Sequence, residues 1–115
     1  ELTEQKHYEE ADLFARAITY KVTGRPKQAD SLLSLALKIN PEDAAANYEK
    51  ARLLSAYGKT KEALILSQKA VRQDSANKWY QVLYADLSKA NGNYKDYLNT
   101  YKKLCEKEPG NLSFQ

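Results

Sequence analysis

The sequence predicts an all-α fold in which three helical hairpins, six helices in all, stack into an open solenoid. The first observation is a fixed spacing of 34 residues between successive turn glycines, Gly24, Gly58 and Gly92. The second is that three alanines repeat with the same step, Ala17, Ala51 and Ala85. The third is that apolar residues between these markers recur at i, i+3, i+4 and i+7, the spacing of one helix face. A repeat of this length is typical of solenoids, where each unit covers its apolar side by packing on the next unit.

The first hairpin shows how each unit is built. Residues 4–23 contain neither proline nor glycine, and they place Phe14, Ala17 and Ile18 on one helical face. Gly24 can adopt the left-handed conformation that follows a helix end. Pro26 suits the first turn of the next helix, because its missing N–H has no partner to lose there.

The second and third hairpins follow the same pattern. Asn40 is expected to cap the third helix, with the carboxylates of Glu42 and Asp43 at its positive end. The expected helices are 4–23, 26–39, 42–57, 60–73, 76–91 and 94–107. A single domain over 1–115 would hold repeats at about 10–43, 44–77 and 78–111, with 112–115 beginning a truncated fourth repeat.

Composition excludes several classes of protein. The 18 basic and 15 acidic residues give a net charge of +3, which is too balanced to indicate a nucleic-acid surface. Apolar runs such as Leu64–Leu66 are far shorter than the roughly 20 residues that a membrane span needs. The single cysteine, Cys105, cannot form an internal disulfide, which leaves both the cytoplasm and the bacterial periplasm open.

No pattern of residues indicates catalysis, a metal or a cofactor. His7 is the only histidine and has no second histidine or cysteine at ligand spacing, so no metal site is expected. Cys105 has no histidine placed to activate it as a nucleophile, and no glycine-rich phosphate loop occurs. We therefore expect a protein that is not an enzyme and that uses no cofactor.

From about residue 10 to residue 109, the sequence resembles the tetratricopeptide repeat family. The resemblance rests on the 34-residue step, the mid-helix alanines, the turn glycines, the second-helix alanines such as Ala29 and Ala36, and the closing prolines Pro41 and Pro109. It implies a right-handed superhelix with a concave groove lined by the first helix of each hairpin. Three features depart from the family, one of them being that its Leu–Gly pair is Arg16-Ala17, Lys50-Ala51 and Tyr84-Ala85 here. The place where the family often has tryptophan holds Leu13, Asn47 and Gln81. Tyr97 stands where a small residue is usual, which predicts looser packing of the third hairpin.

The resemblance also implies which side chains line the groove. The candidate partner-binding residues are Phe14, Ile18, Tyr48, Arg52, Trp79, Val82 and Asp86. Aromatic anchors with a few charges are the composition of protein-binding hot spots. One subfamily grips the C-terminal carboxylate of a chaperone with Lys, Arg and Asn, but the matching places here hold Phe14, Ile18, Glu49, Trp79 and Leu83. That role is not expected.

Three functional hypotheses follow. The leading one is a scaffold segment that binds a peptide or helix of another protein in the groove. The alternative is a purely structural segment of a longer array, with interfaces at the hairpin ends. There the last helix would expose an end interface, Leu98, Tyr101, Leu104 and Cys105, to a second copy or to further repeats. A weaker third hypothesis is nucleic-acid binding by aromatic stacking, which a steep salt dependence would reveal.

Overall fold

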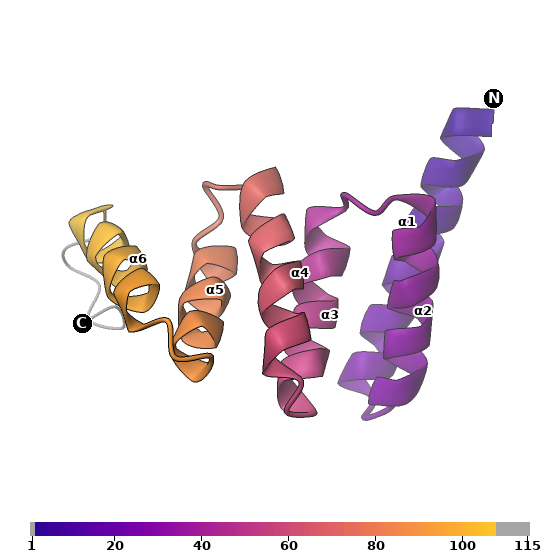
Figure 1. The fold of residues 1–115 in the computed structure, drawn as a ribbon. Coiled ribbons are helices and arrows are strands. Elements are labelled where there is room, and N and C mark those ends of the chain that lie inside the picture. The colour runs from indigo at the N-terminus through magenta and orange to yellow at the C-terminus, as the bar shows by residue number, and fades with distance from the viewer. Residues whose placement is uncertain (1, 108–115) are drawn as a thin grey trace.

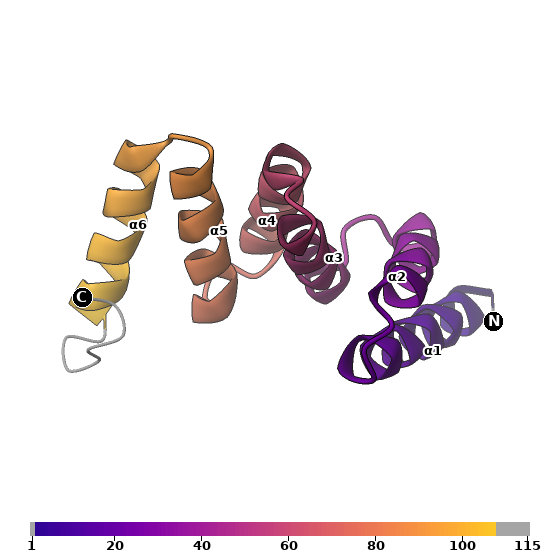
Figure 2. The ribbon, with the colours of Figure 1, turned by 90° about the horizontal axis from the view of Figure 1, so that it is seen from below.

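The computed structural model describes residues 2–107, and six helices follow one another over this range. They are α1 (Leu2–Val22), α2 (Pro26–Ile39), α3 (Ala44–Ala56), α4 (Thr60–Gln73), α5 (Lys78–Ala90) and α6 (Tyr94–Lys107). Figure 1 shows three helix pairs side by side in a row, with α1 and α6 at opposite ends. The view from below shows the same row (Figure 2). The principal extents of the molecule are 44 × 30 × 22 Å. The predicted all-α stack of three hairpins is confirmed, whereas Pro109 and the expected fourth repeat at 112–115 lie outside the described residues.

The three turn glycines occupy equivalent bends. Gly24, Gly58 and Gly92 have φ angles of 79°, 79° and 84°, in the left-handed region that favours glycine. At each turn, the N–H of the residue after the glycine donates to a carbonyl five residues earlier. These bonds join Arg25 to Tyr20 (2.7 Å), Lys59 to Leu54 (2.9 Å) and Asn93 to Ser88 (2.7 Å). The 34-residue period is therefore present in the backbone hydrogen bonds as well as in the sequence.

Alanines at the repeat positions allow the helices to approach closely. Seven of them have no exposed surface, namely Ala17, Ala29, Ala36, Ala51, Ala63, Ala70 and Ala85. One core cluster combines Ala17 of α1 and Leu33 of α2 with Leu53 of α3. A second combines Ala51 and Leu54 of α3 with Leu87 of α5. Each cluster crosses from one hairpin to the next, because a single hairpin cannot cover its own apolar side.

The helices α3 and α5 begin two residues later than the sequence suggested. Asp43, and not Asn40, caps α3, since its carboxylate accepts the N–H of Ala46 at 3.0 Å. The Asn40 side chain instead accepts the N–H of Glu42 at 3.2 Å, inside the turn. Asn77 caps α5 in the same way, accepting the N–H groups of Trp79 and Tyr80 at 3.0 and 3.3 Å.

The third hairpin packs less extensively than the second, although its helices are of similar length. Tyr97 occupies the place of the fully buried Ala29 and Ala63, and it is too large to be buried there. Its ring lies half-buried between the ammonium of Lys89, 5.1 Å from the ring centroid, and the edge-on ring of Tyr101, also at 5.1 Å. The looser packing that Tyr97 predicts is present in the structure.

Candidate functional site

The first helices α1, α3 and α5 carry the predicted groove residues, and an ion pair joins the first two of these helices. The Lys21 ammonium of α1 lies 2.6 Å from a Glu49 carboxylate oxygen of α3. Both side chains are largely covered, with 28% and 12% of their surface exposed. Because solvent screens a covered pair less than an exposed one, this contact fixes α1 against α3 more firmly than a surface ion pair would.

A pair of tyrosines joins α3 to α5. The rings of Tyr48 and Tyr80 have their centroids 4.7 Å apart and are tilted by 35°. The Arg52 guanidinium lies 5.7 Å from the Tyr48 centroid, and it also lies 3.9 Å from the Glu49 carboxylate. Predicted residues Tyr48 and Arg52 are therefore in contact, and Glu49 connects them to Lys21.

Tyr80 belongs to this cluster although the sequence did not identify it. On the 34-residue step, Tyr80 corresponds to Ala46, which is fully buried, whereas Tyr48 corresponds to Val82. A phenol ring is too large for the place of Ala46, so Tyr80 stays half-buried and leans on Tyr48. Burial raises the pKa of Tyr80, and the carboxylates of Asp74 and Asp43 add to the effect. The phenol therefore remains a neutral hydrogen-bonding group.

The remaining candidate residues on α1 and α5 differ in exposure. Phe14 and Ile18 are half-buried, and Phe14 packs against the first core cluster. Val82 is half-buried as well. Trp79 exposes 60% of its surface, with the Lys78 ammonium 5.4 Å from its ring centroid. Trp79 is thus the large aromatic side chain of this set that is most available to a partner.

Asp86 links α5 to α6. Its carboxylate is exposed and accepts a hydrogen bond from the Tyr101 hydroxyl, with 3.0 Å between the two oxygen atoms. Burial, the hydrogen bond and the charge of Asp86 together raise the pKa of Tyr101 to about 12. Tyr101 therefore stays protonated and keeps donating to Asp86 over the whole physiological pH range.

The expected end interface on α6 is only partly exposed. Leu98 exposes 63% of its surface, while Tyr101 and Cys105 are half-buried. The expectation that Leu104 loses its cover is wrong, since Leu104 is only 3% exposed. Leu104 occupies the place of Ala36 and Ala70 on the 34-residue step, and all three are buried.

Other properties of the described residues bear on the class of protein. His7 is exposed, and no group of three or more His, Cys, Asp or Glu side chains within residues 2–107 could hold a metal ion. In the same range, no helix is both long enough and apolar enough to cross a membrane. The features that the surface of α1, α3 and α5 does present are the aromatic rings and paired charges described above.

Comparison with known proteins identifies the fold. No protein-family model matches the chain, and no curated protein matches it. Among solved structures, it is similar to the first tetratricopeptide domain of Spaghetti (RPAP3) bound to an HSP90 peptide. That match has a TM-score of 0.82 and 15% identity, and it covers 93% of this chain and 85% of that chain.

Two further solved structures agree. YrrB, described as a tetratricopeptide protein with an unusual peptide-binding site, matches with a TM-score of 0.77 at 18% identity, over 92% of this chain and 55% of YrrB. Pseudomonas aeruginosa pilF matches with a TM-score of 0.80 at 18% identity, over 90% of this chain and 46% of that chain. The chain thus spans about half the length of these two proteins. Together with the repeated turns and buried alanines, the matches show a tetratricopeptide-type α-solenoid.

Proposed function

We propose that this chain is a non-enzymatic protein-interaction module that holds a peptide or helix of a partner against its first helices. The proposed groove consists of Phe14, Ile18, Tyr48, Arg52, Trp79, Val82 and Asp86. The observation that carries the proposal is the exposure of Trp79 on α5, beside a first-helix surface made continuous by the Lys21–Glu49 and Tyr48–Tyr80 contacts. A surface whose helices are already joined by such contacts needs less ordering on binding, which lowers the entropic cost of association.

The chemistry of the groove favours an apolar or aromatic partner segment. Burying a large aromatic side chain such as Trp79 contributes about 2 to 3 kcal/mol, and Trp and Arg are the commonest hot-spot residues. Glu49 pairs with Lys21 at 2.6 Å and lies farther from Arg52, at 3.9 Å, so the exposed Arg52 and Asp86 are the groove charges most accessible to a partner. Because Phe14 and Ile18 offer no cation, we propose a peptide bound along its length and not by its terminal carboxylate.

Similar proteins provide support of a general kind. One of the similar structures holds an HSP90 peptide, and another is described as having an unusual peptide-binding site. Sequence identities of 15% and 18% indicate a shared fold but do not indicate a shared ligand. The class of peptide proposed for this chain therefore rests on its own residues. We also propose that the repeats run over about 10–43, 44–77 and 78–111.

The test uses peptides selected from a random displayed library. A selected peptide is titrated by fluorescence anisotropy against the chain and against the double variant Trp79→Ala, Arg52→Glu. We expect the double variant to bind at least about tenfold more weakly while keeping its helical circular dichroism. The matched control is Ile65→Ala, Lys61→Glu on α4, which removes an exposed apolar side chain and reverses an exposed charge on a second helix. Equal losses in both double variants would reject the groove assignment.

The alternative function, a structural segment of a longer array, is favoured by one observation. The helix α6 lies at one end of the row (Figure 1), and its Tyr94 and Leu98 expose 59% and 63% of their surface, which suits a helix that packs on a further hairpin. Under this alternative the library yields no peptide that prefers the wild-type groove. Sedimentation would then show self-association that Leu98→Glu abolishes.

A further inference from the structure

A second concave feature lies at the junction of the first two hairpins, outside the first-helix groove. It is a cavity of about 280 Å³ between α2 and α4, with α3 behind it. We call it the junction cavity. Pockets for drug-sized ligands usually measure about 300 to 1,000 Å³, so this volume suits one side chain or a small molecule.

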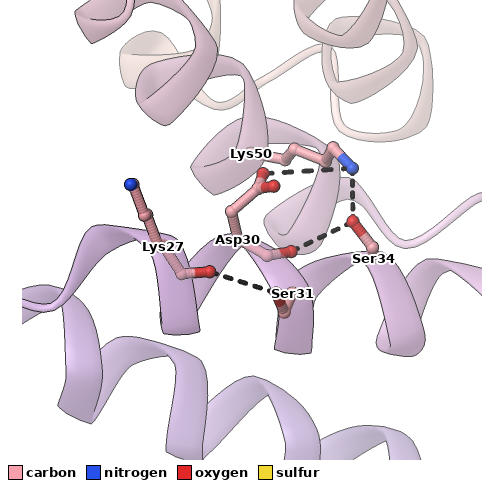
Figure 3. A network of polar contacts seen from close by, with 5 residues as sticks. All are labelled: Lys27, Asp30, Ser31, Ser34 and Lys50. Atoms are coloured by element: carbon pink, nitrogen blue, oxygen red, sulfur yellow. Dashed lines mark hydrogen bonds and ion pairs between the residues drawn. The ribbon is translucent and has the colours of Figure 1, made fainter.

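Lysines from three different helices converge on the junction cavity. They are Lys38 of α2, Lys50 of α3 and Lys69 of α4. The Lys50 ammonium lies 2.5 Å from the Ser34 hydroxyl and 4.0 Å from the Asp30 carboxylate, as Figure 3 shows. The ion pairs among the described residues involve neither Lys38 nor Lys69. Three ammonium groups and one carboxylate therefore leave a local charge of +2.

The wall between these lysines is apolar. Leu37 of α2, Leu66 of α4 and Pro41 of the connection line the cavity together with the stems of the lysines. A simple inorganic anion would leave this wall exposed to water. An anion on an apolar stem would use both the wall and the charges.

The same recess occurs at the next junction with different chemistry. There, Gln68, Val71, Arg72 and Tyr84 line a cavity of about 410 Å³, and they follow Ser34, Leu37, Lys38 and Lys50 by 34 residues. Tyr84 thus replaces Lys50, and Arg72 is the one cation of this lining. Because the repeat folds with tyrosine at this place, the lysine cluster at the first junction is not required by the packing.

We propose that the junction cavity binds an aromatic phosphate monoester, the chemistry of a phosphotyrosine side chain on a partner protein. A phosphate monoester carries about −1.5 to −2 charges at pH 7, which matches the local charge of the lysine cluster. Lysine ammonium groups bind phosphate as point charges. The aromatic stem would lie along Leu37 and Leu66. The Ser34 hydroxyl accepts a hydrogen bond from Lys50 and donates to the Asp30 carbonyl at 3.0 Å, so it positions the Lys50 ammonium at the cavity.

The test is a titration of the ¹⁵N-labelled chain with phenyl phosphate, followed by amide chemical shifts. Inorganic phosphate and phenylacetate serve as the two comparison probes. We expect phenyl phosphate to shift the amides around Ser34, Leu37 and Leu66, and to bind at least about tenfold more tightly than either comparison probe. Equal binding of inorganic phosphate would exclude the aromatic stem. Equal binding of phenylacetate would show that the site does not require a phosphate group. Shifts centred on Tyr84 would show that the ligand binds at the next junction and not in the junction cavity.

Variants test the lysines directly. Lys38→Ala with Lys69→Ala should weaken phenyl phosphate binding by at least about tenfold. The matched control, Lys27→Ala with Lys61→Ala, changes exposed lysines on the same two helices and gives the same net charge. Equal weakening by both pairs would mean unspecific attraction and would overturn the proposal. The groove variant Trp79→Ala, Arg52→Glu should bind phenyl phosphate normally, which separates this site from the proposed function.

Discussion

Glu10 is a carboxyl side chain in an environment that disfavours its charge. It lies on α1 with 6% of its surface exposed, and its Oε1 atom is buried without a hydrogen-bond partner. Burial raises the pKa of Glu10 from 4.5 to about 7. The hydrogen bond and negative charge of Asp43 add to this increase, while a hydrogen bond from Asn40 opposes it. The carboxyl group that caps α3 therefore lies beside a second carboxyl group that titrates near neutral pH.

The raised pKa predicts that the chain loses stability as pH rises from about 4.5 to about 7. In this window the folded chain holds a proton that the unfolded chain has released, so the free energy of unfolding decreases with pH. Glu10→Gln removes the titration and keeps a donor for Asp43. Above pH 7, we expect the variant to be more stable than the wild type by about 1 to 3 kcal/mol, with a difference near zero at pH 4.5.

Urea denaturation between pH 4.5 and pH 8 measures this difference. Glu9→Gln is the matched control, since Glu9 is the exposed neighbour on the same helix. A constant difference between wild type and Glu10→Gln across this range would contradict the assigned pKa.

At the scale of the helix, two amide side chains hold the connections between hairpins. Asn47 is 1% exposed, and its amide donates to the carbonyls of Pro41 and Asp43 at 3.0 and 2.9 Å. Gln81, the next residue on the 34-residue step, donates to the carbonyl of Ser75, which is itself 34 residues after Pro41. These are places where tetratricopeptide sequences often have tryptophan. The amide here binds the preceding turn, whereas a tryptophan would fill space by packing.

We expect Asn47→Ala to lower the free energy of unfolding by about 1 to 3 kcal/mol, because it removes a fully buried amide and leaves the partly buried carbonyl of Pro41 without its donor. Gln81→Ala should cost less than about 1 kcal/mol, since water can reach the exposed Ser75 carbonyl in its place. Chemical denaturation of both variants measures the two costs. Equal costs would show that the buried amide contributes nothing beyond its volume.

Local features of the elements could be predicted from the sequence, and features that depend on neighbouring elements could not. Gly24 and Ala17 were assigned correctly because a left-handed bend and a helix crossing each demand one residue type. The start of α3 was misplaced because Asn40 and Asp43 are both good caps, and only the turn geometry selects Asp43. Likewise, no periodic pattern could show that Tyr80 stacks on Tyr48, because the two residues differ in repeat position.

The same limit applies to the candidate site as a whole. The groove residues follow from an analogy to first-helix positions, and that assignment stays a prediction. Tyr48 and Arg52 are in contact because they lie four residues apart on α3. Phe14 packs partly against the first core cluster. In a sequence, an apolar residue that anchors a partner has the same spacing as one that packs in the core. The junction cavity combines Lys38, Lys50 and Lys69 from three helices, and their convergence follows from the stacking of hairpins and not from any local motif.

At the scale of the whole molecule, each hairpin contacts only its neighbours, so stability should vary along the row. The helices α3 and α4 have a hairpin on each side, whereas α6, within residues 2–107, packs chiefly on α5 and less extensively. We therefore expect amide hydrogen exchange to give opening free energies in α3 and α4 that exceed those in α6 by about 1 to 2 kcal/mol. Equal protection in all six helices would instead mean that the described residues unfold as one cooperative unit.

A substitution at the centre of the row distinguishes these two cases further. Leu54 of α3 is 7% exposed and packs in the cluster that joins the second and third hairpins. Leu54→Ala should cost about 2 to 4 kcal/mol. In a nearest-neighbour stack, that loss should appear in the exchange of α3, α4 and α5, and much less in α1 and α2. Leu35→Ala on α2 is the control, since Leu35 is 45% exposed and its truncation should leave the exchange pattern unchanged. If Leu54→Ala instead lowers the hydrogen-exchange protection of α1 as much as that of α5, the three hairpins unfold together. A partner bound along the groove would then stabilise all three hairpins and not only the junction that it contacts.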